Sequence, residues 1–210
     1  MSKPKQHRKK PRGLTGPIKF ADGRVEREFV QFPDSKPEIE ALIAKLFCTE
    51  SPSSNVQFRR YGFLDHLTPM SENSIDFVVQ TKHGERWLEL AEFAPLDQFG
   101  GKYEEVPNQW SSQTMKDLFI RLVKQKNAKE YGDGVILLIY KTHDTLFVPP
   151  PVQRMIRAEL STTQINLESI YYLSPHSGSS STVWEIWPGN ADTIQESGIG
   201  PNVFVGLPKP

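Results

Sequence analysis

The sequence predicts a single α/β domain, of the α+β kind, in which one mixed β-sheet is flanked by helices. Three observations support this: apolar residues recur at helical spacing within 113–129, residues 135–140 are an unbroken apolar run, and shorter alternating segments lie around them. With 210 residues, 37% of them hydrophobic, the chain can bury a core of this kind. We expect residues 1–17 to form a disordered basic tail and residues 18–210 to form the domain.

The first elements follow from local signals. Alternating residues within 18–32 indicate a peripheral strand. The run Ser35-Lys36-Pro37-Glu38 is typical of a helix start, with a capping serine, a proline in the first turn and an acidic residue near the positive end of the dipole. A helix is therefore predicted over about 37–48.

A three-stranded meander is expected next. Residues 56–64 have the aromatic content and the alternation of a strand, and residues 75–80 and 86–93 have the same character. The segment Lys82-His83-Gly84-Glu85 has the length of a hairpin turn, with a glycine available for positive φ.

The second half predicts a helix, a buried strand and further elements. Residues 95–111 hold prolines and glycines and are expected to be an irregular loop. Ser111 or Ser112 can cap the helix that follows, whose apolar positions are Met115, Leu118, Phe119, Leu122 and Val123. After the central strand at 135–140, a helix near 150–160 and strands near 169–173 and 183–187 complete the prediction.

Several classes of site are excluded or disfavoured by composition. Cys48 is the single cysteine, so no intramolecular disulfide and no cluster of thiolate ligands can form, and we expect Cys48 to pack in the core. The histidines lack metal-binding spacing, and no phosphate-binding glycine loop or nucleophile elbow occurs. No apolar run is long enough to cross a membrane, so a cytoplasmic protein without a membrane partner is expected.

Charge is distributed unevenly along the chain. The first twelve residues contain six basic residues and no acidic one, and the six are Lys3, Lys5, Arg8, Lys9, Lys10 and Arg12. Without them, 19 of the 25 basic residues remain against 25 acidic ones, so the rest of the chain carries a net charge of about −6. The basic segment can bind the phosphates of DNA or RNA, or it can serve only as a solubilising tail.

The order of predicted elements between residues 37 and 140 is helix, three strands, helix, buried strand. This αβββαβ order resembles the core of the PD-(D/E)XK, or restriction-endonuclease-like, superfamily of metal-dependent nucleases. The resemblance implies a carboxylate on the second strand and another on the third, and Asp76 and Glu89 match them. It also implies a Mg²⁺ ion, which prefers hard oxygen ligands and accepts one or two carboxylates with several waters.

The third-strand motif departs from the family pattern at one position. The family lysine is expected at residue 91, where this chain has an alanine. In some relatives an equivalent lysine comes from the following helix, and Lys116 or Lys124 would take that part. The resemblance therefore implies Asp76 and Glu89 as metal ligands and Lys116 as the catalytic lysine, in a nuclease that is active or has lost its activity.

Structural roles for these residues are the alternative. Asp76 can bond to local backbone at a strand start, and Glu89 can form an ion pair with Arg59, Arg60 or Lys141. Glu38 or Glu40 can supply a third acid, or simply stabilise the start of the first helix.

A protein of a different class is also compatible with the sequence. A non-enzymatic interaction or regulatory protein would use the acidic body and a loop over 99–110, with Tyr103 and Trp110 facing solvent, to bind a protein partner.

Overall fold

A computed structural model describes residues 14–21, 24–50, 56–70, 75–129, 131–189 and 205–206. Its centre is a six-stranded mixed sheet with strand order β3-β4-β5-β7-β8-β9. The strands are β3 (Asp65–Pro69), β4 (Phe77–Thr81), β5 (Gly84–Glu92), β7 (Val135–Tyr140), β8 (Ser169–Pro175) and β9 (Ser181–Trp187). β5, β7 and β8 are mutually parallel, and the other neighbours pair in antiparallel fashion. The predicted fold class, one mixed sheet with flanking helices, is confirmed.

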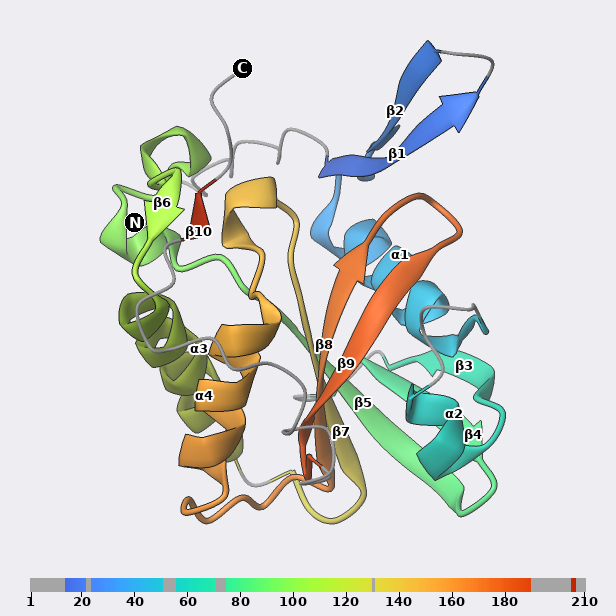
Figure 1. Ribbon diagram of the computed structural model, residues 1–210. Helices are drawn as coiled ribbons and strands as arrows, with labels where there is room; N and C mark the ends of the chain where they lie inside the picture. Colours follow the sequence, from blue (N-terminus) through green and yellow to red (C-terminus); the bar gives the residue numbers. More distant parts are fainter. Residues whose placement is uncertain are drawn as a thin grey trace, which may run out of the picture.

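Helices cover both faces of this sheet (Figure 1). α1 (Lys36–Cys48) and α2 (Val56–Tyr61) lie on one face, and α3 (Ser112–Asn127) and α4 (Pro150–Leu160) lie on the other. Each face has its own apolar core, one built with Phe47 and Tyr61 and the other with Phe119 and Ile156. The sheet is therefore the middle layer of three.

β7 separates the two cores. All six of its residues are buried. Their side chains alternate between the two cores, so that Leu137 packs on the α3 side and Leu138 on the α1 side. An unbroken apolar run is what a strand covered on both faces requires, so the prediction for this segment is confirmed.

α1 begins as its first residues predict. The hydroxyl of Ser35 accepts a hydrogen bond from the backbone N–H of Glu38, and the Glu38 carboxylate accepts one from the backbone N–H of Ser35. This reciprocal capping box satisfies two N–H groups that the helix itself leaves without partners.

The predicted strand over 56–64 is wrong, because this segment begins with the helix α2. Gln57 and Tyr61, four residues apart, are both buried, which is a helical spacing. The Gln57 side chain donates to the backbone oxygen of Phe47 at 2.8 Å, and the Tyr61 hydroxyl lies 2.7 Å from the Ser169 hydroxyl. These two contacts with distant segments hold α2, and the third strand of the meander is instead β3.

The expected tail is shorter than predicted. Residues 14–17 belong to β1 (Leu14–Ala21), which pairs with β2 (Arg24–Val30) in an antiparallel hairpin beside α1 (Figure 1). The register shifts between Thr15 and Ile18, where Gly16 and Pro17 interrupt the regular ladder. Residues 1–13 lie outside the described residues.

The loop expected over 95–111 contains short ordered elements. The 3-10 turns Leu96–Gln98 and Tyr103–Glu105 are followed by β6 (Gln109–Trp110), which pairs with β10 (Val205–Gly206). Another 3-10 turn, Asp144–Leu146, follows β7. In the described part of the chain, no helix is both long and apolar enough to cross a membrane.

Candidate functional site

Asp76 and Glu89 lie close enough for their charges to interact. The β4–β5 ladder pairs Phe77 with Leu88 in antiparallel register, and Asp76 immediately precedes β4. Its carboxylate reaches the backbone of β5 at Leu90, the residue that follows Glu89. The meander thus brings together the two carboxylates that the sequence singles out.

Glu89 is a buried carboxylate with an uneven environment. Its side chain is 3% exposed, and its Oε1 atom accepts from Nζ of Lys126 at 2.5 Å and from the hydroxyl of Tyr131 at 2.9 Å. Nζ of Lys129 lies 3.6 Å from the same oxygen. The other oxygen, Oε2, is buried and makes no hydrogen bond within the described part of the chain. Such an oxygen is costly to bury without a partner.

Asp76 is half-buried and is held by a neighbouring strand. Its Oδ2 atom accepts from the backbone N–H of Leu90 at 2.7 Å. Burial raises the pKa of Asp76 and the charge of Glu89 raises it further, while the Leu90 N–H and the ammonium of Lys126 lower it. The two carboxylates therefore repel each other, and a nearby cation would relieve that repulsion.

The lysine of this site is Lys126, near the end of α3. Its ammonium contacts both Oε1 of Glu89 and, at 3.3 Å, the backbone oxygen of Leu90. Lys116 instead lies 2.6 Å from Glu159 of α4, and Lys124 lies 3.6 Å from the same residue. The structure thus places neither lysine named from the sequence beside the carboxylates.

A sequence signal for Lys126 existed. The buried positions Met115, Phe119 and Val123 of α3 follow one another at four-residue steps, and Lys126 continues this stripe three residues later. Lys116 and Lys124 lie on the side of α3 that faces α4, where both approach Glu159. Tyr131 lies after the helix, and no periodicity in the sequence indicates its role.

The acidic residues of α1 have different roles. Glu38 belongs to the capping box, whereas Glu40 is buried and pairs with Lys36 at 3.1 Å. Burial raises the pKa of Glu40, and the charge of Asp76 raises it as well, so Glu40 adds to the negative potential near the site. Two of the three alternative partners considered for Glu89 are engaged elsewhere, since Arg60 pairs with Glu185 and Lys141 pairs with Asp144, and the third, Arg59, forms no ion pair with Glu89.

A hollow of about 440 Å³ adjoins these groups. Lys129 and Tyr131, which both contact Glu89, form part of its wall, together with Asn127, Ala128, Gly132, Asp133 and Asn166. Glu89 is not itself part of this wall, and Lys129 and Tyr131 link it to the hollow.

The donor set suits a hard cation with few protein ligands. Among the described residues, no three or more His, Cys, Asp or Glu side chains gather closely enough to hold a metal ion. A Mg²⁺ ion needs only one or two carboxylates, and Asp76 with the unbonded Oε2 of Glu89 supplies that number. The residues present fit Mg²⁺ and do not fit a closed zinc site.

The expected solvent-facing aromatic loop is wrong. Tyr103 and Trp110 are 7% and 3% exposed and pack in the core on the α3 side. Phe99 lies edge-on against Trp110, and the Tyr103 hydroxyl donates to the carboxylate of Glu92. Aromatic rings with this much apolar area gain more from the core than from water, so the loop folds inward.

Two other sequence predictions concern Cys48 and the basic segment. Cys48 packs against the core on the α1 side, and burial raises the pKa of its thiol to about 12, which leaves it protonated and unreactive at neutral pH. The basic residues from Lys3 to Arg12 lie outside the described residues.

Comparison with models of protein families, with curated proteins and with solved structures gives no match to this chain. Its function is therefore inferred from the side chains of the site.

Proposed function

We propose that this protein is a Mg²⁺-dependent nuclease of the PD-(D/E)XK kind, acting on DNA or RNA. One observation carries the proposal: Glu89 is buried near Asp76, a lysine and a tyrosine hold one of its oxygens, and its other oxygen has no hydrogen-bond partner among the described residues. The element order α1, β3, β4, β5, α3, β7 also supports it, because this is the order that the resemblance implies once the short helix α2 and the two-residue strand β6 are treated as insertions.

The side chains of the site have separable roles in this proposal. The Leu90 N–H orients Asp76, and Tyr131 and Lys126 orient Glu89, so that both carboxylates can bind the same cation. When bound, Mg²⁺ supplies a polarised phosphoryl group and a water of lowered pKa. The Lys126 ammonium stabilises the negative charge that builds on the phosphate oxygens as the bond to the attacking oxygen forms.

Cleavage of nucleic acid tests the proposal directly. The purified protein should degrade a plasmid or an oligonucleotide with Mg²⁺ or Mn²⁺, and a chelator should abolish this. Asp76→Asn and Glu89→Gln keep side-chain size while removing charge, and each should lower the rate by about 100-fold or more. Circular dichroism of each variant verifies that it is folded.

Two lysine variants test whether the catalytic lysine is Lys126, which contacts Glu89, or Lys116, which was predicted from the sequence. Lys126→Met should lower cleavage about as much as Glu89→Gln, whereas Lys116→Met should leave it within about twofold of the unmodified protein. If no metal and no nucleic acid substrate gives cleavage, and calorimetry detects no Mg²⁺ binding, the protein is not a nuclease.

A further inference from the structure

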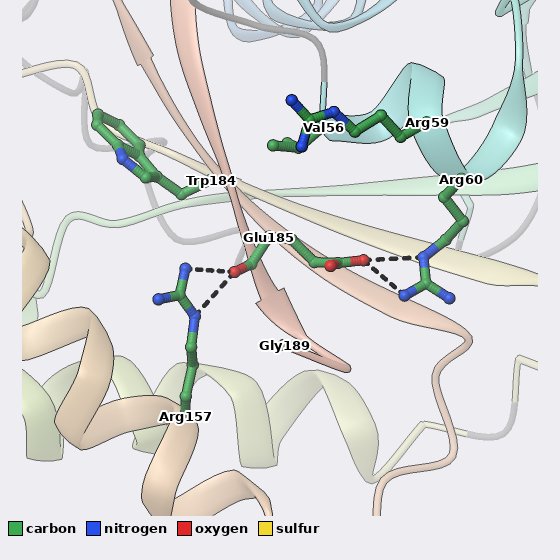
Figure 2. A pocket seen from close by; sticks show the side chains of 7 residues that line it. All are labelled: Val56, Arg59, Arg60, Arg157, Trp184, Glu185 and Gly189. Atoms are coloured by element: carbon green, nitrogen blue, oxygen red, sulfur yellow. Dashed lines mark hydrogen bonds and ion pairs between the residues drawn. The ribbon is translucent and has the colours of Figure 1, made fainter. Parts of the chain in front are cut away.

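A second pocket lies at the opposite edge of the sheet, beside β9. Its volume is about 420 Å³, and its wall is formed by Val56, Arg59, Arg60, Arg157, Trp184, Glu185 and Gly189. These residues come from α2, from α4 and from the end of β9, so the pocket wraps around the edge strand (Figure 2). It shares no residue with the Asp76 and Glu89 site.

Positive charge predominates in this pocket. Among the described residues of its wall, Glu185 is the single acidic one, and its carboxylate accepts from Nε of Arg60 at 2.8 Å. Arg157 donates to the backbone oxygen of Glu185, with Nε and Nη2 at 2.9 and 2.5 Å (Figure 2). The described wall thus holds three guanidinium groups and one carboxylate, which leaves two positive charges uncompensated among these residues.

The guanidinium groups of Arg59 and Arg157 lack a carboxylate partner among the described residues. Arg59 is exposed, and its side chain makes no hydrogen bond or ion pair with a described residue. Arg157 is partly buried, and this burial lowers its pKa, an effect that Glu185 opposes and Arg154 reinforces. An incoming anion would compensate both charges at once.

Gly189 leaves room for the side chain of Arg157. A Cβ atom on Gly189 would lie 2.9 Å from Cδ of Arg157, too close for the arginine to keep its place. On the side of α4, Trp184 supplies an aromatic wall and is itself fixed by stacking on Tyr172 at 5.6 Å between ring centroids. The pocket is thus shaped by packing as well as by charge.

We propose that this pocket binds the terminal phosphate of a nucleic acid strand. Guanidinium groups form paired hydrogen bonds with phosphate oxygens, and a phosphate monoester carries a charge of about −1.5 to −2 at neutral pH, which matches the two uncompensated arginines. The volume holds a nucleotide rather than a lone phosphate group. The choice of a strand as ligand rests on the proposed function, whereas the choice of phosphate rests on the arginines.

The test measures binding of the full chain to three fluorescent oligonucleotides of one sequence, carrying a 5′ phosphate, a 3′ phosphate or no terminal phosphate. A chelator is present throughout, so the result does not depend on cleavage. One of the phosphorylated strands should bind about tenfold more tightly than the unphosphorylated strand, in fluorescence anisotropy titrations. Equal affinity for all three would overturn the proposal.

Variants locate the effect in the pocket. Arg59→Gln replaces an exposed guanidinium group that has no partner among the described residues. It should reduce the affinity advantage of the phosphorylated strand to about twofold. Arg157→Lys, which keeps the charge but loses the planar fork, should reduce it as well. Arg121→Gln is the matched control, because Arg121 lies on α3 and pairs with Asp97; it should keep the full advantage.

The remaining outcomes also decide the matter. A phosphate advantage that survives both pocket variants places the phosphate elsewhere and overturns the assignment. A nucleoside monophosphate that competes as strongly as the phosphorylated strand identifies a free nucleotide as the ligand and overturns the choice of a strand. Absence of Mg²⁺-dependent cleavage, by contrast, refutes only the nuclease chemistry.

Discussion

The two carboxylate oxygens of Glu89 differ in their hydrogen bonding. A carboxylate that is 2% exposed requires compensation, and the structure provides it for only one of the two oxygens. In a buried ion pair with only a structural role, both carboxylate oxygens are expected to have hydrogen-bond partners. Breaking such a pair, or leaving one of its oxygens without a partner, is strongly destabilising. In the proposed function, the unbonded Oε2 is the atom that would bind the cation.

Removing the lysine should expose this cost. Lys126→Met leaves Glu89 buried with Tyr131 and the more distant Lys129, so the free energy of unfolding should fall by about 3 kcal/mol in urea titrations. Lys116→Met breaks a more exposed pair and should cost less than about 1 kcal/mol. The double variant Glu89→Leu with Lys126→Met should recover most of the loss, and failure to do so would show that the ammonium matters beyond this pair.

Asp76 should make stability depend on pH. Its pKa is raised in the folded protein, chiefly by burial, so the folded state binds its proton more tightly than the unfolded state does. The stability that this provides is complete below about pH 4, the usual value for an aspartate, and is lost as the pH rises through the raised pKa.

Asp76→Asn should therefore unfold at a higher temperature than the unmodified protein at pH 7, and the difference should shrink as the pH falls towards 4. The asparagine oxygen can still accept from the Leu90 N–H, so the hydrogen bond is preserved. Addition of Mg²⁺ should raise the midpoint of the unmodified protein and leave that of the variant unchanged. A variant less stable than the unmodified protein at pH 7 would contradict the assigned direction.

At the scale of elements, α2 shows how a short segment takes its structure from its neighbours. It has six residues, too few for a helix to be stable in isolation, and Gln57 and Tyr61 attach it to α1 and β8. Its position also presents Arg59 and Arg60 to the β9 pocket. The arginine pocket therefore depends on the docking of this helix.

The contact between Tyr61 and Ser169 can be measured by a double-mutant cycle. Tyr61→Phe removes the hydroxyl that lies 2.7 Å from Ser169 and should lower the free energy of unfolding by about 1 kcal/mol. In a protein that already carries Ser169→Ala, the same change should have little further effect. Additive effects of the two substitutions would mean that the hydroxyl groups stabilise the fold independently.

At the scale of the whole molecule, the sheet separates two candidate sites by chemistry. The β4–β5 side carries carboxylates suited to a cation, and the β9 edge carries arginines suited to an anion. Outside its first twelve residues the chain is acidic, so nucleic acid would not bind it through a general excess of positive charge. The proposed function therefore requires that nucleic acid bind at the arginine pocket and at the basic segment.

Deletion of residues 1–12 tests the contribution of that segment. It removes Lys3, Lys5, Arg8, Lys9, Lys10 and Arg12, and the slope of log affinity against log salt should fall by up to about 5 if each contacts a phosphate. The preference for a terminally phosphorylated strand should remain, because the pocket is intact. An unchanged slope would exclude a role for the segment in binding.

The spacing of residues along the sequence was sufficient to predict those elements whose structure depends mainly on their own residues. Ser35 and Glu38 mark the start of α1, the stripe through Met115 and Phe119 marks α3, and the apolar run of β7 marks a covered strand. Asp76 and Glu89 were named from the resemblance, and Glu89 also because an acid among apolar strand residues is rare; their role as metal ligands stays a prediction. Lys126 was missed because several lysines of α3 were candidates and only one faces the sheet.

The sequence by itself therefore determined the class of fold, the two acids and the acidic charge of the body, since periodicity and composition are properties of neighbouring residues. Only the tertiary structure decided that 56–61 is a helix, that Tyr103 and Trp110 turn inward, that Lys126 serves Glu89, and that three arginines line one pocket. The reason is physical: these features depend on contacts between residues tens of positions apart, which the folded sheet brings together and local spacing does not record.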